Sequence, residues 1–272
     1  PKLQYLLNKP PIARRTICWF HGYEVRDYRR LSFNYSTAEH ARLKDTLERA
    51  NASRFDAARV TFENNDIKKV FVSDYLLRIA ADDVGVVPTN SFVIHNYVEG
   101  GRFRRRVRRP DEATRLLLLR PFTRHNYGAD IAVEAIRYLS SRPEFHKLRI
   151  VLRGFGSNFE QMTQPVASLP NVELQKQFSS HHEMATLFDT HGIFLYPTRF
   201  DTQGVTLGEA MASGMVCVAT GVTAVPEFIN QECGVLAPTA NPYDFATAIW
   251  SLIAEPERLS ALSETAADRA EA

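Results

Sequence analysis

Long apolar runs are missing from this 272-residue chain. None approaches the roughly 20 residues that a membrane-spanning helix needs. The start of the chain lacks the basic and apolar regions of a signal peptide. Cysteine is also scarce: Cys18, Cys217 and Cys233 lie far apart and form no Cys-x-x-Cys pair. The sequence therefore predicts neither a disulfide framework nor a zinc site, and it favours a reducing, cytoplasmic location.

An excess of charge of one sign is lacking as well, because 33 Lys and Arg nearly balance 31 Asp and Glu. The net charge of +2 implies no obligate polyanionic partner, and we do not expect nucleic acid as a partner. No internal repeat or low-complexity tract is present. Apolar residues make up 44% and charged residues 24% of the chain, which is ordinary for a globular protein with room for one large or two medium domains.

Strand-like and helix-like segments alternate along the chain, the pattern of mainly parallel sheets covered by helices. In the first part we expect strands at Thr16–Phe20, Lys69–Ser73 and Phe92–His95, and helices at Thr37–Ala50, Arg54–Asn64 and Asp74–Asp82. In the second part we expect strands at Arg115–Leu119, Leu148–Leu152, Val172–Gln175, Ile193–Tyr196 and Val216–Thr220. Helices are expected there at Ala129–Leu139, Glu183–Asp189, Thr206–Ser213, Tyr243–Ile253 and Glu257–Leu262. The sequence thus predicts two α/β units with a cleft between them.

An arginine-rich segment separates the two parts. Residues 99–110 contain the pair Gly100-Gly101, six arginines and Pro110, which together favour a linker. We therefore expect one domain at residues 1–98 and another at 111–272. The plain interpretation of Arg102–Arg109 is a solvated linker. The alternative is contact with a phosphorylated acceptor or with anionic lipid at the inner face of the membrane, worth roughly 1 kcal/mol per basic residue.

The most informative segment is residues 197–214. It follows the apolar run Gly192–Tyr196, which predicts a buried strand, and it leads into a short helix that ends at Gly214. Ligands of open α/β sheets bind at the carboxyl ends of strands, and free helix N–H groups attract anions. The carboxylates of Asp201 and Glu209 lie eight positions apart in this segment and are suited to bind hydroxyl groups. The segment therefore predicts a phosphate-bearing ligand flanked by two acids.

Asp201 together with the run Glu209-Ala210-Met211-Ala212-Ser213-Gly214 resembles the signature of the retaining GT-B glycosyltransferases of family 4. That signature is an acidic residue, seven others, and a glutamate in an E-A-M-A-x-G helix; the first acid is Asp here, where Glu is usual. Four further segments are similar to family motifs in the same order: Phe71–Leu76 to "V-S-x-x-L", Val93–Val98 to "I-x-N-G-V", Gly154–Gly156 to "G-x-G", and Ala224–Glu227 to "G-x-x-E". The similarity covers most of residues 68–262.

The resemblance implies a GT-B fold of two Rossmann-like α/β domains that face a cleft. It also implies that the N-terminal, acceptor-side domain is incomplete and that the chain, which starts at Pro1 without Met, is truncated at both ends. The implied activity is transfer of a hexose-like sugar, with retention, from a nucleoside diphosphate donor to a hydroxyl of a glycan or lipid-linked acceptor. Neither a metal nor a cofactor is expected, and the implied role is cell-surface polysaccharide synthesis.

A departing diphosphate needs cationic or amide groups, because negative charge develops on it. The family places an Arg and a Lys on the diphosphate from the loop after the first strand of the second domain. By resemblance we expect Arg120 and Arg124 in these roles, and the alternative for both is surface charge. Gly204, Val205 and Thr206 open the helix and would point backbone N–H groups at phosphate.

By the same resemblance, Glu209 binds the ribose hydroxyls, while Asp201 and His21 orient the transferred sugar. The alternatives are that Asp201 caps the helix, that Glu209 is a first-turn residue favoured by the helix dipole, and that His21 is structural. Gly154 and Gly156 are expected to form a turn beside the nucleotide.

Gln177 is expected to face the base through its backbone. An NAD-dependent oxidoreductase is disfavoured, since the turn at Gly154 lacks the third glycine and the later acidic residue of a dinucleotide fingerprint. His181, His182 and His191 lack a carboxylate at metal-ligand spacing, so we expect them at the surface or as helix caps. A non-catalytic nucleotide-sugar-binding or scaffold module of a larger synthase remains the competing hypothesis, because Asp replaces Glu at position 201.

Overall fold

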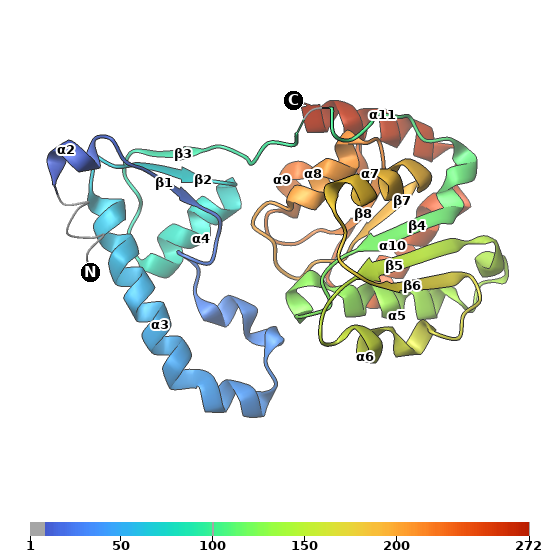
Figure 1. Cartoon of the computed structure of the whole chain (residues 1–272), viewed down its shortest axis with the longest axis horizontal. Helices are drawn as coiled ribbons and strands as arrows, with labels where there is room; N and C mark the ends of the chain where they lie inside the picture. The colour runs from blue at the N-terminus through green and yellow to red at the C-terminus, as the bar shows by residue number, and fades with distance from the viewer. Residues whose placement is uncertain (1–8, 100, 272) are drawn as a thin grey trace. The chain divides into compact units, whose positions relative to one another are not determined.

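The computed structural model of the protein describes residues 9–99 and 101–271, and these fold into two compact units that divide between Asn96 and Tyr97. Each unit is built on its own parallel sheet (Figure 1). The division lies just before the predicted boundary at residue 98, and the predicted linker belongs to the second unit. Gly100, which is part of that linker, lies outside the described residues. No helix in the described ranges is both long and apolar enough to cross a bilayer.

The first unit holds a three-stranded parallel sheet in the order β1 (Ile17–Phe20), β2 (Lys68–Phe71), β3 (Ser91–Val93). Its long helix α3 (Thr37–Glu63) packs on this sheet through Phe62. The ring centroids of Phe20, Phe62 and Phe71 lie 5.1 to 5.8 Å from one another, so three aromatic side chains join the helix to two strands. Shorter elements complete the unit: α2 (Pro10–Ala13), the 3-10 helix η1 (Tyr28–Asn34) and α4 (Asp74–Val84).

α3 is a single helix of 27 residues, whereas we predicted two helices, Thr37–Ala50 and Arg54–Asn64. It begins at a capping box in which Ser36 and Glu39 exchange hydrogen bonds. The polar stretch in its middle stays helical because the amide of buried Asn51 accepts a hydrogen bond from the N–H of Tyr28, at 3.2 Å. This contact keeps the Asn51 side chain from competing for the helix backbone.

The second unit holds a six-stranded sheet in which every neighbouring pair is parallel. Its order is β6 (Val172–Lys176), β5 (Arg149–Gly154), β4 (Arg115–Leu119), β7 (Ile193–Tyr196), β8 (Val216–Thr220), β9 (Gly234–Ala237). The chain builds outward from β4 through β5 to β6, and then returns to the other side of β4 for the remaining strands. This reversal creates a topological switch point between β4 and β7, where sheets of this kind bind ligands beyond the carboxyl ends of the strands.

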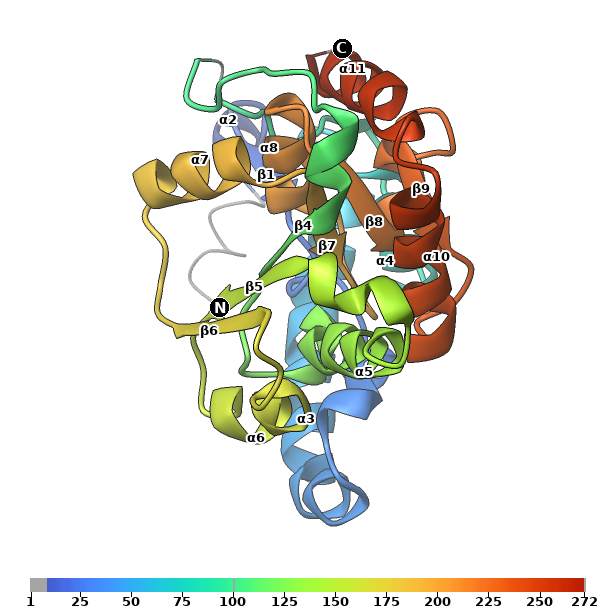
Figure 2. The ribbon, with the colours of Figure 1, turned by 90° about the vertical axis from the view of Figure 1, so that its right-hand side faces the viewer.

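Helices cover both faces of this sheet (Figures 1 and 2). Successive residues of a strand point to opposite faces, so Leu116 and Leu118 of β4 pack in a core with α5 (Ala129–Leu139) and α10 (Pro242–Ala254). Leu117, on the other face, packs in a second core with α7 (His181–Thr190), α8 (Val205–Ala212) and α11 (Arg258–Glu271). The shorter helical segments of the unit are η2 (Pro110–Thr114), η3 (His125–Tyr127), η4 (Pro143–Lys147), α6 (Phe159–Thr163), η5 (Gln164–Val166) and α9 (Val225–Phe228).

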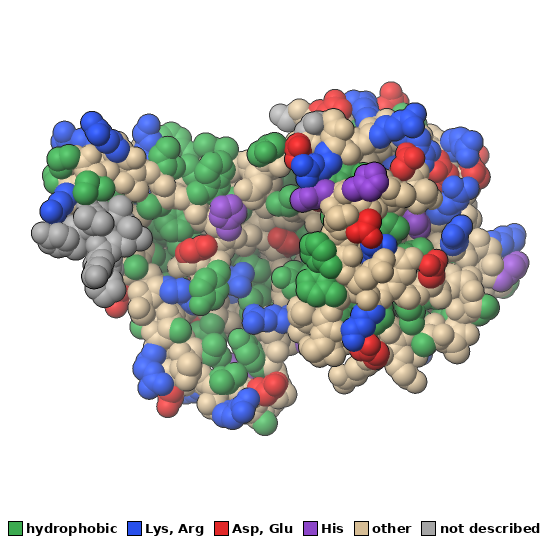
Figure 3. All heavy atoms as spheres, in the orientation of Figure 1, with side chains coloured by type: hydrophobic (Ala, Val, Ile, Leu, Met, Phe, Trp, Pro, Cys, Tyr) green, Lys and Arg blue, Asp and Glu red, His purple; other side chains and the backbone are tan. Residues whose placement is uncertain are grey.

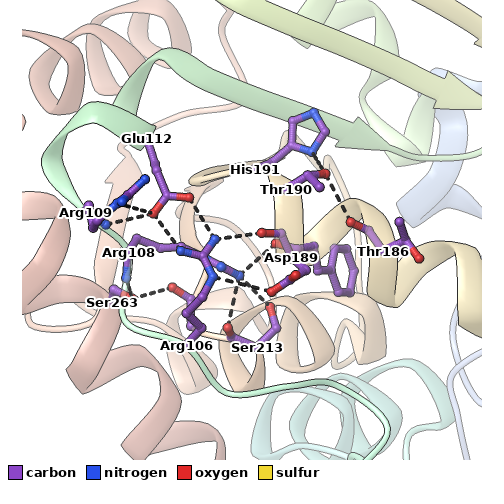
Figure 4. Close-up of polar contacts among 12 residues, drawn as sticks. Arg106, Arg108, Arg109, Glu112, Thr186, Asp189, Thr190, His191, Ser213 and Ser263 are labelled. Carbon is purple, nitrogen blue, oxygen red and sulfur yellow. Dashed lines mark hydrogen bonds and ion pairs between the residues drawn. The ribbon is translucent and has the colours of Figure 1, made fainter.

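The arginine-rich segment is not a solvated linker, and this corrects the plain interpretation of the sequence. Phe103 and Arg108 are buried in the second unit, with 6% and 0% of their surface exposed. Arg108 donates to the backbone oxygen of Ser213 at 3.0 Å, and Arg106 pairs with both carboxylate oxygens of Glu112 at 2.7 Å (Figure 4). These contacts fix the segment against α7 and α8.

Most of the positive charge of this segment is compensated. Arg102 pairs with Glu99, Arg105 with Asp268 and Glu271, and Arg109 with Asp111. Within the described part of Arg102–Arg109, Arg104 alone is exposed without an ion pair. On the face drawn in Figure 3, basic and acidic side chains are interspersed over the second unit. Electrostatic attraction to an anionic surface is therefore weaker than six arginines suggest.

We expect Glu112→Gln to lower the free energy of unfolding by about 3 kcal/mol at pH 7, because it removes the buried carboxylate that makes the bidentate pair with Arg106 and leaves only the longer ion pair with Asp189, at 3.4 Å. Burial favours the protonated acid, but hydrogen bonds from Arg106 and from the N–H of Arg109 outweigh it and hold the pKa of Glu112 at about 2. The unfolded chain takes up this proton near pH 4.5, so the stabilisation is complete above that pH and is lost as the pH falls through about 2.

Urea denaturation from pH 7 to pH 3 measures the free energy of unfolding of the wild-type protein and of Glu112→Gln. The difference between the two values should become smaller only at the acidic end of this range. Glu144→Gln is the matched control, since Glu144 is exposed in the same unit. Equal effects of the two substitutions would contradict the stabilising role of the Arg106–Glu112 pair.

Candidate functional site

Two loops meet at the switch point between β4 and β7. Residues 120–128 follow β4 and residues 197–204 follow β7. The backbone oxygen of Asn126 accepts hydrogen bonds from the hydroxyl of Thr198 and from the N–H of Arg199, both at 2.9 Å. The Arg199 guanidinium also makes a bidentate ion pair with Asp130, at 2.7 Å, in the first turn of α5. These contacts lock the two loops together.

Arg120 is a buried cation in this junction, with 6% of its surface exposed. Its guanidinium carbon lies 4.1 Å from the ring centroid of Tyr196 and 5.3 Å from that of Tyr127. Nε donates to the backbone oxygen of Tyr127 at 3.3 Å. Nη2 lies 3.7 Å from Oδ2 of Asp201, too far for a hydrogen bond, and finds no other acceptor in the described residues. A desolvated cation with an unused donor is suited to receive an anion.

The Asp201 carboxylate is largely engaged by its own surroundings. Oδ1 accepts the N–H groups of Thr202 and Gln203 at 2.8 and 3.3 Å, and Oδ2 accepts the hydroxyl of Tyr196 at 2.5 Å. Burial raises the pKa of Tyr196 strongly, so this hydroxyl keeps its proton and donates. Asp201 does not cap α8, because Gly204 is the N-cap. What it leaves for a ligand is the remaining lone pair of Oδ2, beside Arg120.

The N-terminus of α8 is uncapped by any side chain. The first N–H groups of a helix have no partner within it, so those of Val205 and Thr206 face outward at the positive end of the helix dipole. Gly204 precedes them with φ +86°, a conformation that favours glycine. A Cβ at this position would lie 2.6 Å from the Tyr196 hydroxyl, so glycine is required for space as well.

Glu209 lies one turn into α8 and is 8% exposed. Its carboxylate makes no hydrogen bond within the part of the chain that the structure describes. Burial raises the pKa of Glu209 to about 7, and the positive charge of Arg102 opposes this shift. A buried carboxyl group without a partner is unfavourable, and hydroxyl donors of a ligand would relieve it.

A pocket of about 270 Å³ opens beside these groups. Its wall includes Arg120 after β4, Gly154 at the end of β5 with Phe155 after it, residues 177–181 after β6, and Thr206 of α8. The exposed rings of Phe155 and Phe178 meet edge to face, with centroids 5.5 Å apart. The pocket therefore joins a positively charged end at Arg120 to an aromatic end.

Of the predicted site residues, Arg120, Gly154, Gln177 and Thr206 line this pocket. Asp201, Gly204, Val205 and Glu209 lie in the loop and helix after β7 but are not among its lining residues, and the other three predicted residues lie elsewhere. Arg124 is exposed in the loop after β4 and has no ion pair or hydrogen bond from its side chain among the described residues. Gly156 does not line the pocket: it has φ +148° and lies against the backbone of Phe122, where a Cβ would come within 2.4 Å. His21 belongs to the first unit, where its Nε2 lies 3.2 Å from Oδ1 of Asn96.

The histidines outside the predicted site differ in their roles. His181 is exposed, as expected, and it also lines the pocket at the start of α7. His191 is the C-cap of α7, where its Nδ1 lies 2.8 Å from the backbone oxygen of Leu187, and burial lowers its pKa. The sequence analysis did not predict that Tyr196 and Arg153 hydrogen-bond to residues of the loops around the site. For Arg153 the sequence did contain an indication, because this charged residue directly follows the apolar run Ile150–Leu152.

We expect Glu209→Gln to stabilise the protein above pH 7 and to change its stability little near pH 4.5. The folded state holds this proton up to about pH 7, whereas the unfolded chain releases it near pH 4.5. The wild-type protein therefore loses stability as the pH rises between these values, by on the order of 2–3 kcal/mol, and the amide does not. Denaturation at pH 4.5 and pH 8 measures the difference, with exposed Glu264→Gln as the control. If the difference in stability between the wild-type protein and Glu209→Gln were the same at both pH values, the Glu209 carboxylate would have a stabilising partner in the protein.

Comparisons with known proteins agree with this geometry. Residues 113–255, more than half of the chain, match the family model of the glycosyl transferases group 1. The D-inositol 3-phosphate glycosyltransferase of Corynebacterium aurimucosum is 26% identical over 151 residues, which are 53% of this chain and 36% of that protein. The chain thus spans about a third of the length of this relative.

Solved structures with the same fold cover more of the chain. Sucrose-phosphate synthase from Thermosynechococcus elongatus superposes with a TM-score of 0.72 at 18% identity, over 94% of this chain and 62% of that one. Anabaena HepE in complex with UDP superposes with a TM-score of 0.67 at 14% identity, over 80% of this chain and 63% of that one. These similarities establish the GT-B fold with its Rossmann-like α/β units. The chain belongs to the glycosyl transferases group 1.

Proposed function

We propose that this chain carries the donor-binding part of a hexosyltransferase that uses a nucleoside diphosphate sugar. The observation that carries the proposal is Arg120, a buried cation whose Nη2 has no acceptor in the described residues, in a pocket that also includes Thr206 at the uncapped start of α8. Both groups present positive charge to the same space. A diphosphate supplies the matching negative charge. HepE, which shares the fold, was solved with UDP bound, and this supports the choice of ligand.

The proposed roles combine the positions of these groups with the roles that the family motifs imply. Arg120, Arg124 and the N–H groups of Val205 and Thr206 stabilise the charge that develops on the departing diphosphate. Glu209, buried and without a partner among the described residues, accepts from the ribose hydroxyls. The base occupies the aromatic end of the pocket, where Gln177 contributes to the wall.

Asp201 and His21 orient the transferred sugar in this proposal. The oxygen of Asp201 that faces Arg120 retains a lone pair for a sugar hydroxyl. We also propose a metal-independent transfer in which Arg120, Arg124 and the start of α8 supply the positive charge, with retention at the anomeric carbon as in the family that the motifs resemble.

The acceptor is a hydroxyl of a glycan or of a lipid-linked sugar, and the proposed role is cell-surface polysaccharide synthesis. The relative named for D-inositol 3-phosphate is consistent with a hydroxyl-rich acceptor. We do not assign a lipid contact to Arg102–Arg109, because Arg105 and Arg106 are neutralised by acids of the same unit.

A second candidate is a non-catalytic nucleotide-sugar-binding module. One observation favours it: the first acid of the family motif is the shorter Asp201, and three of its hydrogen-bonding positions are taken by Tyr196, Thr202 and Gln203. A carboxylate occupied in this way is less available to a sugar than a free one.

Donor hydrolysis by the full-length protein distinguishes the two candidates. We expect slow hydrolysis of at least one member of a panel of UDP-, GDP- and ADP-hexoses, together with binding of the corresponding nucleoside diphosphate. Binding without any turnover, even with added glycan acceptors, would favour the module. The absence of binding to every member of the panel would refute both candidates.

We expect Arg124→Ala to lower turnover at least tenfold, which is about 1.4 kcal/mol of activation free energy. Arg124 is exposed, so its removal should leave the melting temperature nearly unchanged. Arg149→Ala is the matched control, because Arg149 is an exposed arginine at the opposite end of the sheet, where β5 begins. If Arg124→Ala is as active as this control while Arg120→Lys is impaired, the diphosphate is bound without Arg124.

A further inference from the structure

The apolar run Ile150–Leu152 of β5 predicts another apolar residue at the next position, but that position is occupied by Arg153. It is buried, with 6% of its surface exposed. In the sheet it lies between Leu119 of β4 and Gln175 of β6. Its side chain therefore leaves the strand near the carboxyl edge of the sheet, under the start of α7.

The guanidinium of Arg153 binds a single stretch of chain at several points. Nε donates to the hydroxyl of Ser179 at 2.7 Å, Nη1 to the amide oxygen of Gln175 at 3.1 Å, and Nη2 to the carboxylate of Glu183 at 2.6 Å. With the amide oxygen of Gln177 turned toward the guanidinium, Gln177 accepts from Nη1 and Nη2 at 2.6 and 2.9 Å. All five N–H donors of the side chain then have acceptors.

This stretch forms one wall of the donor pocket. Gln177, Phe178, Ser179 and His181 line the pocket, and the ring of Phe178 meets that of Phe155. The backbone of Phe178 and Ser179 makes no hydrogen bond to other backbone groups of the described residues. The wall thus has no support from the sheet ladder, and side-chain bonds to Arg153 provide it.

We propose that Arg153 is a positioning residue that fixes the wall contacting the nucleobase, without touching the nucleotide itself. The inference rests on the proposed function of this pocket. By holding residues 177–179, Arg153 determines where the Phe178 ring stands against Phe155, and hence the aromatic surface offered to a base. Affinity for the nucleoside part of the donor then depends on Arg153. Affinity for the diphosphate part depends on Arg120 and the start of α8.

The test compares Arg153→Met with Arg149→Met, a control on the same strand whose side chain is exposed. Binding of UDP, GDP, ADP and inorganic pyrophosphate is measured by calorimetry on the full-length protein, and the melting temperature of each variant is recorded. We expect Arg153→Met to weaken the best-bound nucleoside diphosphate at least tenfold, about 1.4 kcal/mol. Pyrophosphate affinity should change by less than about twofold, and Arg149→Met should match the wild-type protein.

Arg153→Lys should recover part of the lost affinity, because lysine keeps the charge opposite Glu183 but lacks the planar fork that reaches the other acceptors. If Arg153→Met does not fold, Glu183→Gln provides the test, since glutamine preserves the capping box at Ser180 while removing the ion pair with Arg153. We expect it to weaken the same nucleoside diphosphate severalfold and to spare pyrophosphate.

The outcomes separate this inference from the proposed function. If the wild-type protein binds no nucleoside diphosphate, the proposed function fails and the role of Arg153 fails with it. Suppose instead that the wild-type protein binds a nucleoside diphosphate. The positioning role alone is then overturned if Arg153→Met, or Glu183→Gln in its place, binds that nucleotide as tightly as the wild type does. It is also overturned if the variant loses as much affinity for pyrophosphate as for the nucleotide.

Discussion

The reversal of strand order beside β4 is the constraint on which the rest of the second unit depends. It brings the loops after β4 and β7 to the same point, and the hydrogen bonds to the Asn126 oxygen keep them in contact. Between these loops, Arg120 is held against the rings of Tyr127 and Tyr196, shielded from water. A charge in such a place is unfavourable unless an opposite charge meets it, and the helix that begins after the second loop adds further positive potential. The topology thus brings a buried cation and the start of a helix to one point, and this is the basis of the anion site that we propose.

The buried charged groups of this protein differ in how completely they are hydrogen-bonded. Glu112 and Arg153 are each satisfied by several partners, and they hold segments of backbone in place. Arg120 and Glu209 are not: the first has an unused donor, and the second has no hydrogen-bonding partner among the described residues. Incomplete bonding does not by itself mark a site, because Arg108 is fully buried and its Nε and Nη1 also have no hydrogen-bond partner among the described residues. What distinguishes Arg120 is that it lines a pocket, together with Thr206 at the start of α8, the helix that carries Glu209. This is why we propose one ligand with both anionic and hydroxyl parts for Arg120 and Glu209.

Strong local patterns made much of the second unit predictable. β4, α5, β7 and β8 have the predicted bounds, because short apolar runs bounded by loops and helical apolar spacing leave little choice. β9 was missed, since Gly234–Ala237 is short and carries no pattern of its own; its place is set by pairing with β8. Burial of Arg108 was also unpredictable, because its acceptors are backbone oxygens of Phe188 and Ser213, distant in sequence. The motifs suggested the loop residues of the candidate site, but which of their hydrogen-bond donors lack an acceptor depends on side-chain contacts that no sequence spacing encodes.

The replacement of Glu by Asp at position 201 has a physical explanation in these contacts. The shorter side chain keeps its carboxylate close to the backbone, where Oδ1 accepts from two successive N–H groups, Thr202 and Gln203. Oδ2 meets the Tyr196 hydroxyl, which could not come this close if residue 204 carried a Cβ. A glutamate would extend the carboxylate past these partners and toward the ligand space. The contacts of Asp201 therefore hold the turn that precedes α8, with Oδ2 3.7 Å from Nη2 of Arg120.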